Sequence, residues 1–215
     1  MVKNNELENY YAKRTLEYEN IYLKPERQEY IKESKALLKK YFENKNVLEI
    51  ACGTGFWTET ISEVSNCVMA TDLNNEVLEI ARSKKYNCKV DFIQDDSYEL
   101  NKIKGKYDSL FAGFWFSHIP KSRIRKFLET VNGKIDENGI IVFMDNIYVE
   151  GNSTPISKFD KEGNSYQTRK LNDNSQYEVL KNFYNENELK NYIKDYGKEI
   201  IFNDLKYYWI IKYRK

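Results

Sequence analysis

The segment Val47-Leu-Glu-Ile-Ala-Cys-Gly-Thr-Gly55 indicates the fold most clearly. A short apolar run leads into a loop that contains Gly53 and Gly55, and a helical stretch begins near Phe56. Glycines allow a sharp turn and a close approach between backbone and ligand. Open α/β sheets bind their ligands at the carboxyl ends of their strands, where such a loop would lie. An ordinary strand-to-helix turn needs only one glycine, so the pair favours a ligand-binding loop.

Strand-like and helix-like segments alternate after this loop. Strands are predicted over residues 67–72, 89–93, 107–114 and 139–144. Helices are predicted over residues 74–83 and 121–132, and the second carries apolar residues at helical spacing. An earlier helix is predicted to begin near Pro25, because proline suits a first helical turn. The alternation predicts an α/β fold with a parallel sheet and helices on both faces.

The carboxyl-terminal part departs from this alternation. Residues 147–176 are polar and carry Gly, Asn and Ser, and a hairpin is predicted from residues 166–171 and 176–183. A final helix over residues 186–196 is predicted to stop at Gly197, because glycine is favoured just after a helix end. Residues 198–203 and 207–213 are predicted to close the sheet as an antiparallel pair.

Acidic residues follow the second and third predicted strands. Asp72 ends the second strand, where a carboxylate can accept hydrogen bonds from both hydroxyls of a ribose. Asp95 and Asp96, followed by Ser97, end the third strand, where a carboxylate can accept from an adenine amino group. Capping of the next helix is the alternative role for each acid, and the doublet leaves open which aspartate would bind.

The composition narrows the class of partner. The chain has 215 residues, with 34 Lys and Arg against 33 Asp and Glu, and a formal net charge of +1. This balance supplies no long-range field to attract nucleic acid or an acidic membrane surface. The three cysteines match no zinc-binding spacing, so no metal is expected and the thiols are predicted to be free. The start of the chain lacks an apolar leader, which predicts a cytoplasmic protein.

The stretch Leu-Glu-Ile-Ala-Cys-Gly-Thr-Gly at residues 48–55 resembles motif I of class I methyltransferases that depend on S-adenosylmethionine (SAM). Asp72, Asp96 and the strand at residues 107–114 fall where that family has its next motifs, and the likeness runs from around residue 30 to residue 146. The chain is similar to the small-molecule branch that includes ubiquinone- and menaquinone-pathway methyltransferases. The resemblance implies one domain over residues 1–215, built on a Rossmann-like, seven-stranded, mostly parallel sheet with a C-terminal antiparallel strand pair. It also implies SAM as the cofactor and S-adenosylhomocysteine as the product.

The resemblance implies a set of cofactor-binding residues at the strand ends. They are Glu49, Ala51, Gly53, Gly55, Asp72, Leu73, Asp96, Ser97 and Ala112. Glu49 and the glycine loop would line the methionine part of SAM. Asp72 would hold the ribose, Leu73 would pack on adenine, and Asp96 would face the adenine amino group. Ala51 departs from the family, which often has its first glycine at this position.

The acceptor would lie beside residues 112–120, Ala-Gly-Phe-Trp-Phe-Ser-His-Ile-Pro, which follow the fourth strand. His118 is the only histidine in the chain, and histidine suits proton removal because it titrates near neutral pH. It is the candidate catalytic base, with helix capping or a backbone hydrogen bond as the alternative role. Phe114 and Trp115 are candidate substrate-binding residues in an aromatic wall, with core packing as the alternative. The Asp/Asn-Pro-Pro-Tyr/Phe motif of exocyclic-amino methyltransferases is missing, which disfavours a nucleobase acceptor.

Two further segments are assigned by the resemblance. Residues 1–24 resemble the helical lid that such enzymes fold over SAM, and Tyr11, Arg14 and Tyr18 fall at helical spacing within it. All three would bind the cofactor, with Arg14 paired to the SAM carboxylate, and a solvated amphipathic helix is the alternative. Residues 147–183 would form a substrate-side insertion with Tyr166 and Arg169 as candidate substrate-binding residues. A surface salt bridge is the alternative role for Arg169.

The favoured hypothesis is methyl transfer from SAM to a nitrogen or oxygen of a small aromatic or heteroaromatic molecule. A dehydrogenase is disfavoured because the dinucleotide fingerprint has a third glycine, whereas Gly55 is followed by Phe56, Trp57 and Thr58. A methyltransferase for RNA or protein is one alternative, which an added domain or a strongly basic face would favour. A SAM-binding regulatory protein without turnover is the other. The acceptor atom and the oligomeric state stay open.

Overall fold

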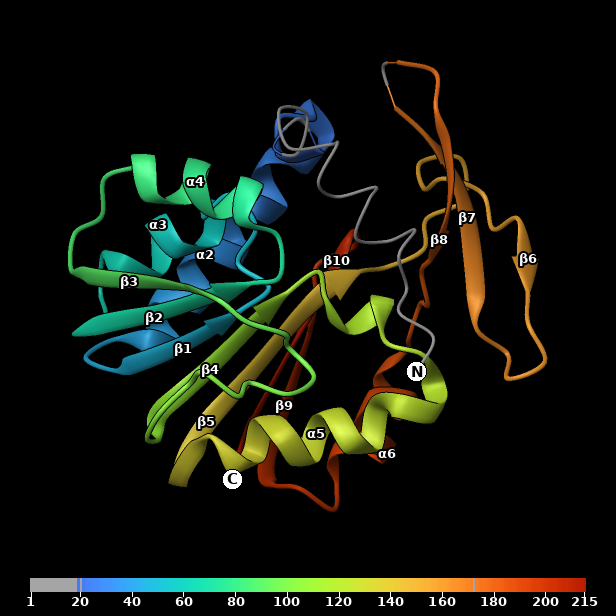
Figure 1. Cartoon of the computed structure of the whole chain (residues 1–215). Coiled ribbons are helices and arrows are strands. Elements are labelled where there is room, and N and C mark those ends of the chain that lie inside the picture. Colours follow the sequence, from blue (N-terminus) through green and yellow to red (C-terminus); the bar gives the residue numbers. More distant parts are fainter. Residues whose placement is uncertain (1–18, 20, 172) are drawn as a thin grey trace.

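A seven-stranded sheet in the order β3-β2-β1-β4-β5-β10-β9 organises the chain (Figure 1). The structure is a computed structural model that describes residue 19 and residues 21–171 and 173–215. The strands are β1 (Asn46–Ile50), β2 (Cys67–Asp72), β3 (Lys89–Gln94), β4 (Tyr107–Gly113), β5 (Ile135–Asn146), β9 (Lys198–Asp204) and β10 (Tyr208–Arg214). Neighbours from β3 to β5 are parallel, whereas β10 pairs antiparallel with both β5 and β9. The predicted fold class is confirmed, including the closing antiparallel pair.

Helices cover both faces of this sheet, as Figure 1 shows. They are α2 (Gln28–Phe42), α3 (Phe56–Ser62), α4 (Asn75–Ser83), α5 (Ile124–Gly133) and α6 (Glu186–Ile193). Short 3-10 turns, η2 (Pro25–Arg27) and η4 (Lys121–Arg123), lead into α2 and α5, and η3 (Phe116–His118) follows β4. Buried side chains of α2, α3 and α4 share one hydrophobic cluster, and those of α5 and α6 share the other.

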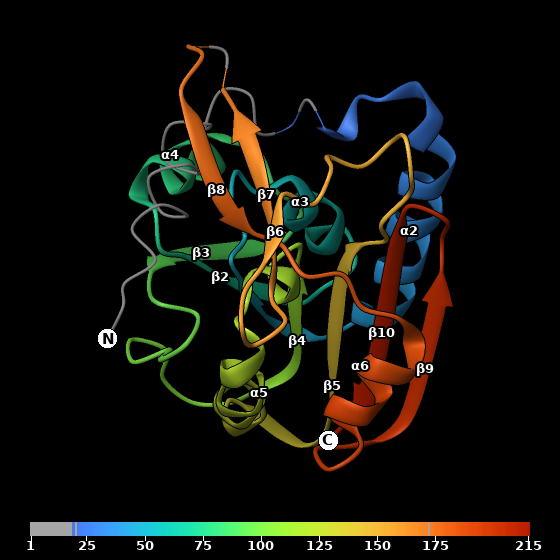
Figure 2. The ribbon, with the colours of Figure 1, turned by 90° about the vertical axis from the view of Figure 1, so that its right-hand side faces the viewer.

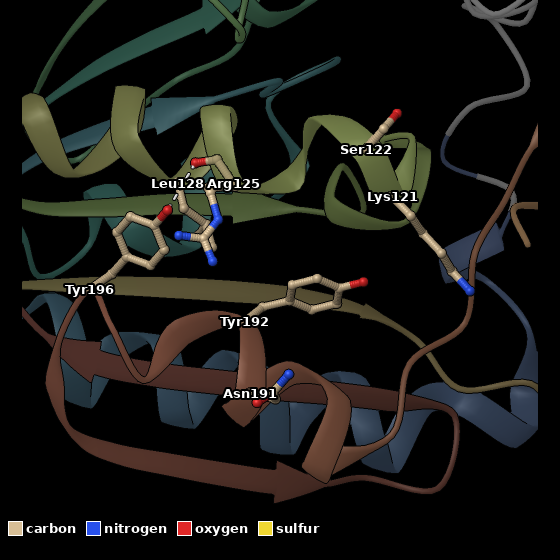
Figure 3. A pocket seen from close by; sticks show the side chains of 7 residues that line it. All are labelled: Lys121, Ser122, Arg125, Leu128, Asn191, Tyr192 and Tyr196. Atoms are coloured by element: carbon tan, nitrogen blue, oxygen red, sulfur yellow. Dashed lines mark hydrogen bonds between the residues drawn. The ribbon is translucent and has the colours of Figure 1, made fainter. Parts of the chain in front are cut away.

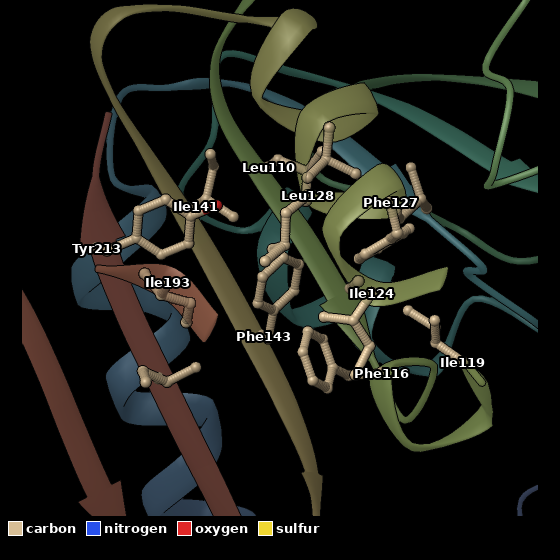
Figure 4. Packing of buried hydrophobic residues seen from close by; sticks show 14 of the residues in the cluster. Leu110, Phe116, Ile119, Ile124, Phe127, Leu128, Ile141, Phe143, Ile193 and Tyr213 are labelled. Carbon is tan, nitrogen blue, oxygen red and sulfur yellow. The ribbon is translucent and has the colours of Figure 1, made fainter. Parts of the chain in front are cut away.

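The alternation of side chains along each strand separates these two clusters. In β1, Leu48 and Ile50 join the cluster under α5 and α6, whereas Val47 joins the cluster under α2 and α3. Figure 4 shows the first cluster, where Phe143 of β5 lies between strand residues and the buried face of α5. Each fully buried side chain of this size stabilises the fold by about 1.5–3 kcal/mol. The clusters hold the strand ends, and therefore the loops after them, in fixed relative positions.

A second, smaller sheet lies beyond the carboxyl ends of β4 and β5 (Figures 1 and 2). It consists of β6 (Lys158–Phe159), β7 (Ser165–Lys170) and β8 (Gln176–Leu180), all antiparallel. The predicted hairpin is confirmed as β7 and β8. The strand β6 was not predicted, because two residues are too few to show a period.

The end of α6 differs from its prediction. The helix ends at Ile193 instead of Tyr196, because Tyr196 N–H donates to the Ile193 carbonyl at 2.8 Å and tightens the last turn. Gly197 does not have the positive φ of a helix-ending glycine. A Cβ there would collide with the Tyr213 ring and the Arg214 carbonyl, so close packing against β10 explains this glycine.

Among the helices of residues 19, 21–171 and 173–215, none is long and apolar enough to cross a membrane. The cysteines, Cys52, Cys67 and Cys88, are all free thiols, as predicted from their spacing.

Candidate active site

The loop after β1 adopts the left-handed backbone that its glycines allow. Gly53 and Gly55 have φ values of +56° and +80°, and Ala51 has a φ of +52°. A Cβ on Gly55 would lie 2.5 Å from the Tyr86 hydroxyl and 3.2 Å from the Ala81 Cβ. Position 55 therefore needs glycine for its backbone angle and also because α4 approaches closely. Ala51 also lies in this left-handed region, where an L-residue is less stable than glycine by about 1–2 kcal/mol.

Asp72 joins the glycine loop to the end of β2. Its Oδ2 accepts from the Gly53 N–H at 2.9 Å, and its Oδ1 accepts from the Asn74 N–H at 2.9 Å. Burial raises the pKa of this carboxyl, while the backbone donors, first that of Asn74, oppose the rise. A carboxylate has about four lone-pair sites, so Asp72 keeps capacity for two more donors. This arrangement suits the ribose diol for which Asp72 was predicted.

Glu49 is a carboxyl group buried in the sheet. Its side chain is 1% exposed on β1, and its Oε2 has no hydrogen-bond partner in the described part of the chain. Burial raises the pKa of Glu49 to about 8, and the negative charge of Asp72 adds to the rise. A buried acceptor without a donor costs about 1–3 kcal/mol, which an incoming cationic donor would recover. An amino group is such a donor.

The structure distinguishes the two aspartates after β3. Asp95 accepts from the backbone N–H groups of Asp96 and Lys102 through its two oxygens, so it shapes its own loop. Asp96 uses Oδ1 to accept from the Tyr98 N–H at 2.8 Å, and no described residue engages its Oδ2. Asp96 is thus the better placed of the doublet to receive a ligand donor, while the adjacent Ser97 is buried.

A hydrophobic side chain stands next to these acids. Leu73 is 37% exposed, which is unusual for leucine in this chain, and its carbonyl accepts from Gln94 Nε2 at 2.8 Å. The exposed leucine is where an adenine ring was predicted to pack. Ala112, by contrast, is fully buried near the end of β4, where it pairs with Ile50 and Phe143.

The two predicted aromatic wall residues point to different clusters. Phe114, with a φ of +58°, packs with Tyr22, Trp57 and Tyr208 on the α2 and α3 side. Trp115 packs on the other side, 5.6 Å from the Tyr98 ring and near the small sheet. Phe114 is therefore mainly a core residue, whereas Trp115 is partly exposed and its indole N–H has no hydrogen-bond partner in the described part of the chain.

His118 lies in η3 and is 2% exposed. Its Nδ1 is 2.6 Å from the Leu180 carbonyl oxygen at the end of β8. Its ring centroid is 6.5 Å from that of Trp115. The backbone hydrogen bond considered from the sequence is therefore present, and it ties the candidate base to the small sheet.

A buried ion pair beside His118 was not predicted. Lys181 Nζ donates to Asp145 Oδ1 at 2.6 Å and to Ser117 Oγ at 2.7 Å. The side chains of Lys181 and Asp145 are 4% and 0% exposed. The sequence does mark Asp145, which is an acid near the carboxyl end of a continuous apolar strand, as Asp72 is. Lys181 carries no such signal, since nothing in its local sequence marks it as buried.

The residues proposed in the insertion are engaged within the small sheet. The Tyr166 hydroxyl donates to Asp160 Oδ2 at 3.1 Å, and burial raises the pKa of Tyr166 to about 12. Arg169 donates to Gln167 Oε1 through Nη2 at 2.9 Å.

Tyr11, Arg14 and Tyr18 lie outside the described residues. The first described residue, Glu19, nevertheless contacts the glycine loop. Its Oε1 accepts from the Thr54 hydroxyl at 2.7 Å and from Lys84 Nζ at 2.6 Å. This contact, which the sequence did not predict, places Glu19 beside the proposed cofactor loop.

A cavity of about 340 Å³ lies elsewhere, between α5 and α6 (Figure 3). It is lined by Lys121, Ser122, Arg125, Leu128, Asn191, Tyr192 and Tyr196, none of which was predicted to bind cofactor or substrate. In the described part of the chain, no group of three His, Cys, Asp or Glu side chains is placed to hold a metal ion. The described residues of the predicted cofactor set lie instead at the carboxyl ends of β1, β2 and β3 and, for Ala112, near that of β4.

Sequence comparisons point to one family. The family model described as a methyltransferase domain matches residues 47–139. A demethylmenaquinone methyltransferase of Lactococcus lactis subsp. lactis (strain IL1403) is 33% identical over 81 residues, covering 35% of this chain and 32% of that protein. The match therefore spans about a third of the length of this curated relative.

Solved structures share the whole architecture. A DhpI-SAM-HEP complex has a TM-score of 0.81 at 22% identity and covers 100% of both chains. A DhpI-SAH complex has a TM-score of 0.79 at 22% identity, with 97% of this chain and 94% of that chain covered. The PH0226 protein from Pyrococcus horikoshii OT3 has a TM-score of 0.70 at 19% identity, with 89% and 92% covered. At these identities the likeness establishes the fold.

Proposed function

We propose that this chain, which matches a methyltransferase-domain model over residues 47–139 and shares the fold of SAM-bound structures, transfers a methyl group from SAM to a nitrogen or oxygen of a small aromatic or heteroaromatic molecule. One observation carries the cofactor part of this proposal. The Gly53 N–H in the loop after β1 donates to the carboxylate of Asp72, the last residue of β2, at 2.9 Å. The hydrogen bond fixes the glycine loop and the half-buried Asp72 carboxylate next to each other, at the strand ends where α/β sheets bind ligands.

The residues at this edge fit the parts of SAM. Glu49 would receive the amino group of the methionine part, because its Oε2 is buried and lacks a partner among the described residues. Asp72 would accept from the ribose hydroxyls, and the exposed Leu73 would cover the adenine ring. Asp96 would accept from the adenine amino group through its Oδ2. Tyr11, Arg14 and Tyr18 are proposed to complete the site from a lid over residues 1–24.

The main requirement of methyl transfer is that the acceptor atom lies close to the methyl carbon and in line with its bond to sulfur. Bound SAM would supply an electrophilic methyl group. The acceptor lone pair would bond to the methyl carbon, and the electron pair of the broken carbon–sulfur bond would stay on sulfur. Holding the two reactants in line can supply about 7–11 kcal/mol of the barrier. We propose that His118 takes the proton of the acceptor hydroxyl or amine, and that Trp115 beside it stacks on the acceptor ring.

The small sheet is proposed as the part that selects the acceptor. It lies beyond the carboxyl ends of β4 and β5 (Figure 1), and Trp115 packs between it and the core. Tyr166 and Arg169 would contact the acceptor after leaving their present partners. The relatives support a small-molecule acceptor, because one is named for demethylmenaquinone and another was solved with SAM and HEP.

Calorimetric titration with SAM and S-adenosylhomocysteine tests the cofactor part. Asp72→Ala is expected to weaken both by roughly 10- to 100-fold, because hydrogen bonds to a charged group contribute about 1.5–3 kcal/mol. Asp195→Ala, an exposed aspartate after α6, is the matched control and should bind as the original protein does. Failure of the folded protein to bind either ligand would overturn the proposal.

A second experiment tests the acceptor part. Formation of S-adenosylhomocysteine is measured with phenolic, heteroaromatic and amine acceptors. Trp115→Ala is expected to raise KM for the acceptor, and His118→Gln is expected to lower kcat by about 10²–10⁴-fold for a hydroxyl acceptor. SAM binding should stay unchanged in both variants. If turnover were unaffected by both changes, the acceptor site would have been placed wrongly.

A further inference from the structure

A dense network of buried hydrogen bonds joins η3 to the end of β8. Lys181 Nζ contacts Asp145 Oδ1 at 2.6 Å and Ser117 Oγ at 2.7 Å. Asp145 Oδ2 accepts from the Ser117 N–H at 2.9 Å, and the Asn182 N–H donates to the Ser117 carbonyl at 2.8 Å. The network therefore holds two short segments together, residues 117–118 and residues 180–182.

The charges in this network are unusual for their burial. Lys181 and Asp145 are 4% and 0% exposed, and removing two charges from water is unfavourable unless each is well paired. A packed apolar pair of similar size would stabilise a protein as well or better. Buried ion pairs are weak evidence for stability, so a role in fixing geometry explains this one better.

The same two segments hold the His118 ring. Nδ1 of His118 is 2.6 Å from the Leu180 carbonyl oxygen. A carbonyl oxygen only accepts hydrogen bonds, so Nδ1 has to carry the proton. In a neutral imidazole the lone pair then belongs to Nε2, because each ring nitrogen takes one of the two roles.

The ion pair and the histidine bond are adjacent along the chain. His118 follows Ser117 directly, and Lys181 follows Leu180 directly. The Lys181 N–H also donates to the Ser165 carbonyl at 2.9 Å, which fixes the Leu180–Lys181 peptide from the side of β7. Loss of the contact between Lys181 and Ser117 is therefore expected to loosen the neighbouring bond between His118 and Leu180.

We propose that Lys181 and Asp145 are positioning residues that hold His118 in the Nδ1-protonated tautomer, with Nε2 as the atom that accepts the acceptor's proton. The part about the acceptor's proton rests on the proposed function, whereas the tautomer does not. The atoms balance: the acceptor's O–H or N–H proton moves to Nε2, which makes the ring an imidazolium, while Nδ1 keeps its own proton and continues to donate it to the Leu180 carbonyl oxygen.

The tautomer can be measured directly, because His118 is the only histidine in the chain. Protein labelled with ¹⁵N-histidine is studied by long-range proton–nitrogen NMR above the pH at which the ring becomes neutral. The Nδ1-protonated form is expected as the single major species, without any cofactor or substrate. A spectrum dominated by the Nε2-protonated form would overturn the proposal.

Two variants test the role of the ion pair. Lys181→Met keeps the length of the side chain and removes its charge, and it is expected to give a mixture of both tautomers. Lys181→Met combined with Asp145→Asn leaves no buried charge unpaired, so it preserves folding if the single variant does not. Lys190→Met is the matched control, because it removes a 2.6 Å pair with Glu186 whose partners are 43% and 47% exposed. An unchanged tautomer in a folded Lys181 variant would show that the pair does not position His118.

Activity adds a separate measurement. With an identified hydroxyl acceptor, the Lys181 variants are expected to lose at least tenfold in kcat while their affinity for SAM stays unchanged. The NMR result stands without turnover, so a wrong proposed function would leave the tautomer intact. A wrong positioning role would leave both the tautomer and kcat unchanged in the variants.

Discussion

Glu49→Gln is expected to stabilise the ligand-free protein, by an amount that depends on pH. Burial raises the pKa of Glu49 from an ordinary value of 4.5 to about 8. Between these values the folded state keeps a proton that the unfolded state has lost. Stability therefore falls as the pH rises from 4.5 to 8, because the folded chain binds more protons. Glutamine cannot ionise, so the variant escapes this loss.

The size of the effect follows from the distance between the pH and the ordinary pKa. Each pH unit above 4.5 lowers the free energy of unfolding by about 1.4 kcal/mol, so at pH 7 the buried Glu49 costs about 3 kcal/mol of stability. At pH 5 the same calculation gives less than about 1 kcal/mol. For a chain of this length, 1 kcal/mol shifts Tm by about 2–4 °C, so the gain at pH 7 corresponds to about 6–12 °C.

Urea unfolding and scanning calorimetry at pH 5 and pH 7 measure this difference. Glu43→Gln is the matched control, because Glu43 is exposed just before β1 and its loss should change stability little at either pH. An equal gain at both pH values would refute the reasoning, since a gain from packing alone has no reason to follow pH. The stabilised variant should also bind SAM more weakly, because an amide cannot carry the charge that attracts the amino group.

Two further substitutions test the backbone of the glycine loop. Gly55→Ala is expected to lower the free energy of unfolding by about 1–3 kcal/mol, and by more than Gly105→Ala, which has a similar φ of +76° but no atom within 4 Å of its Cβ. If the two alanine variants lost equal stability, the contact with the Tyr86 hydroxyl would contribute nothing. Ala51→Gly is expected to gain about 0.5–1 kcal/mol, because relief of about 1–2 kcal/mol is partly offset by unfolded-state entropy. Asn44→Gly is its control at a φ of +56°, and thermal unfolding of all four variants compares the effects.

The sheet was predictable because its strands carry strong local signals. The run around Leu48 is apolar, short and followed by glycines, and the runs that form β2 and β3 are similarly short and end at polar residues. The parallel sheet followed from the alternation of strands with helices, whereas the order of the strands was not predicted and comes from the structure. The end of α6 was not predictable from Gly197, because the packing of that glycine against Tyr213 depends on residues far along the chain.

In the candidate site, too, residues marked by a local sequence pattern were predictable, whereas contacts between distant residues were not. Asp72 was predicted because an acid at the end of a strand is a local pattern. The choice between Asp95 and Asp96 needed the hydrogen bonds of the loop, since both have the same sequence context. The pair of Lys181 with Asp145 joins residues 36 positions apart. No periodicity connects such residues, so only the three-dimensional contact reveals it.

Two residues with unfavourable backbone angles follow the neighbouring strands β1 and β4, and they support a ligand site at these strand ends independently of any family likeness. Ala51 follows β1 with a φ of +52°, and Phe114 follows β4 with a φ of +58°. Positive φ is a marked outlier for a residue as bulky as phenylalanine. Glu49 lies in β1, just before Ala51, and the free-energy cost of burying its carboxyl group rises with pH. Such strain persists only where the surrounding structure enforces it, and it concentrates at functional sites. A fold selected for stability alone would place glycine at position 51 and an uncharged residue at position 49.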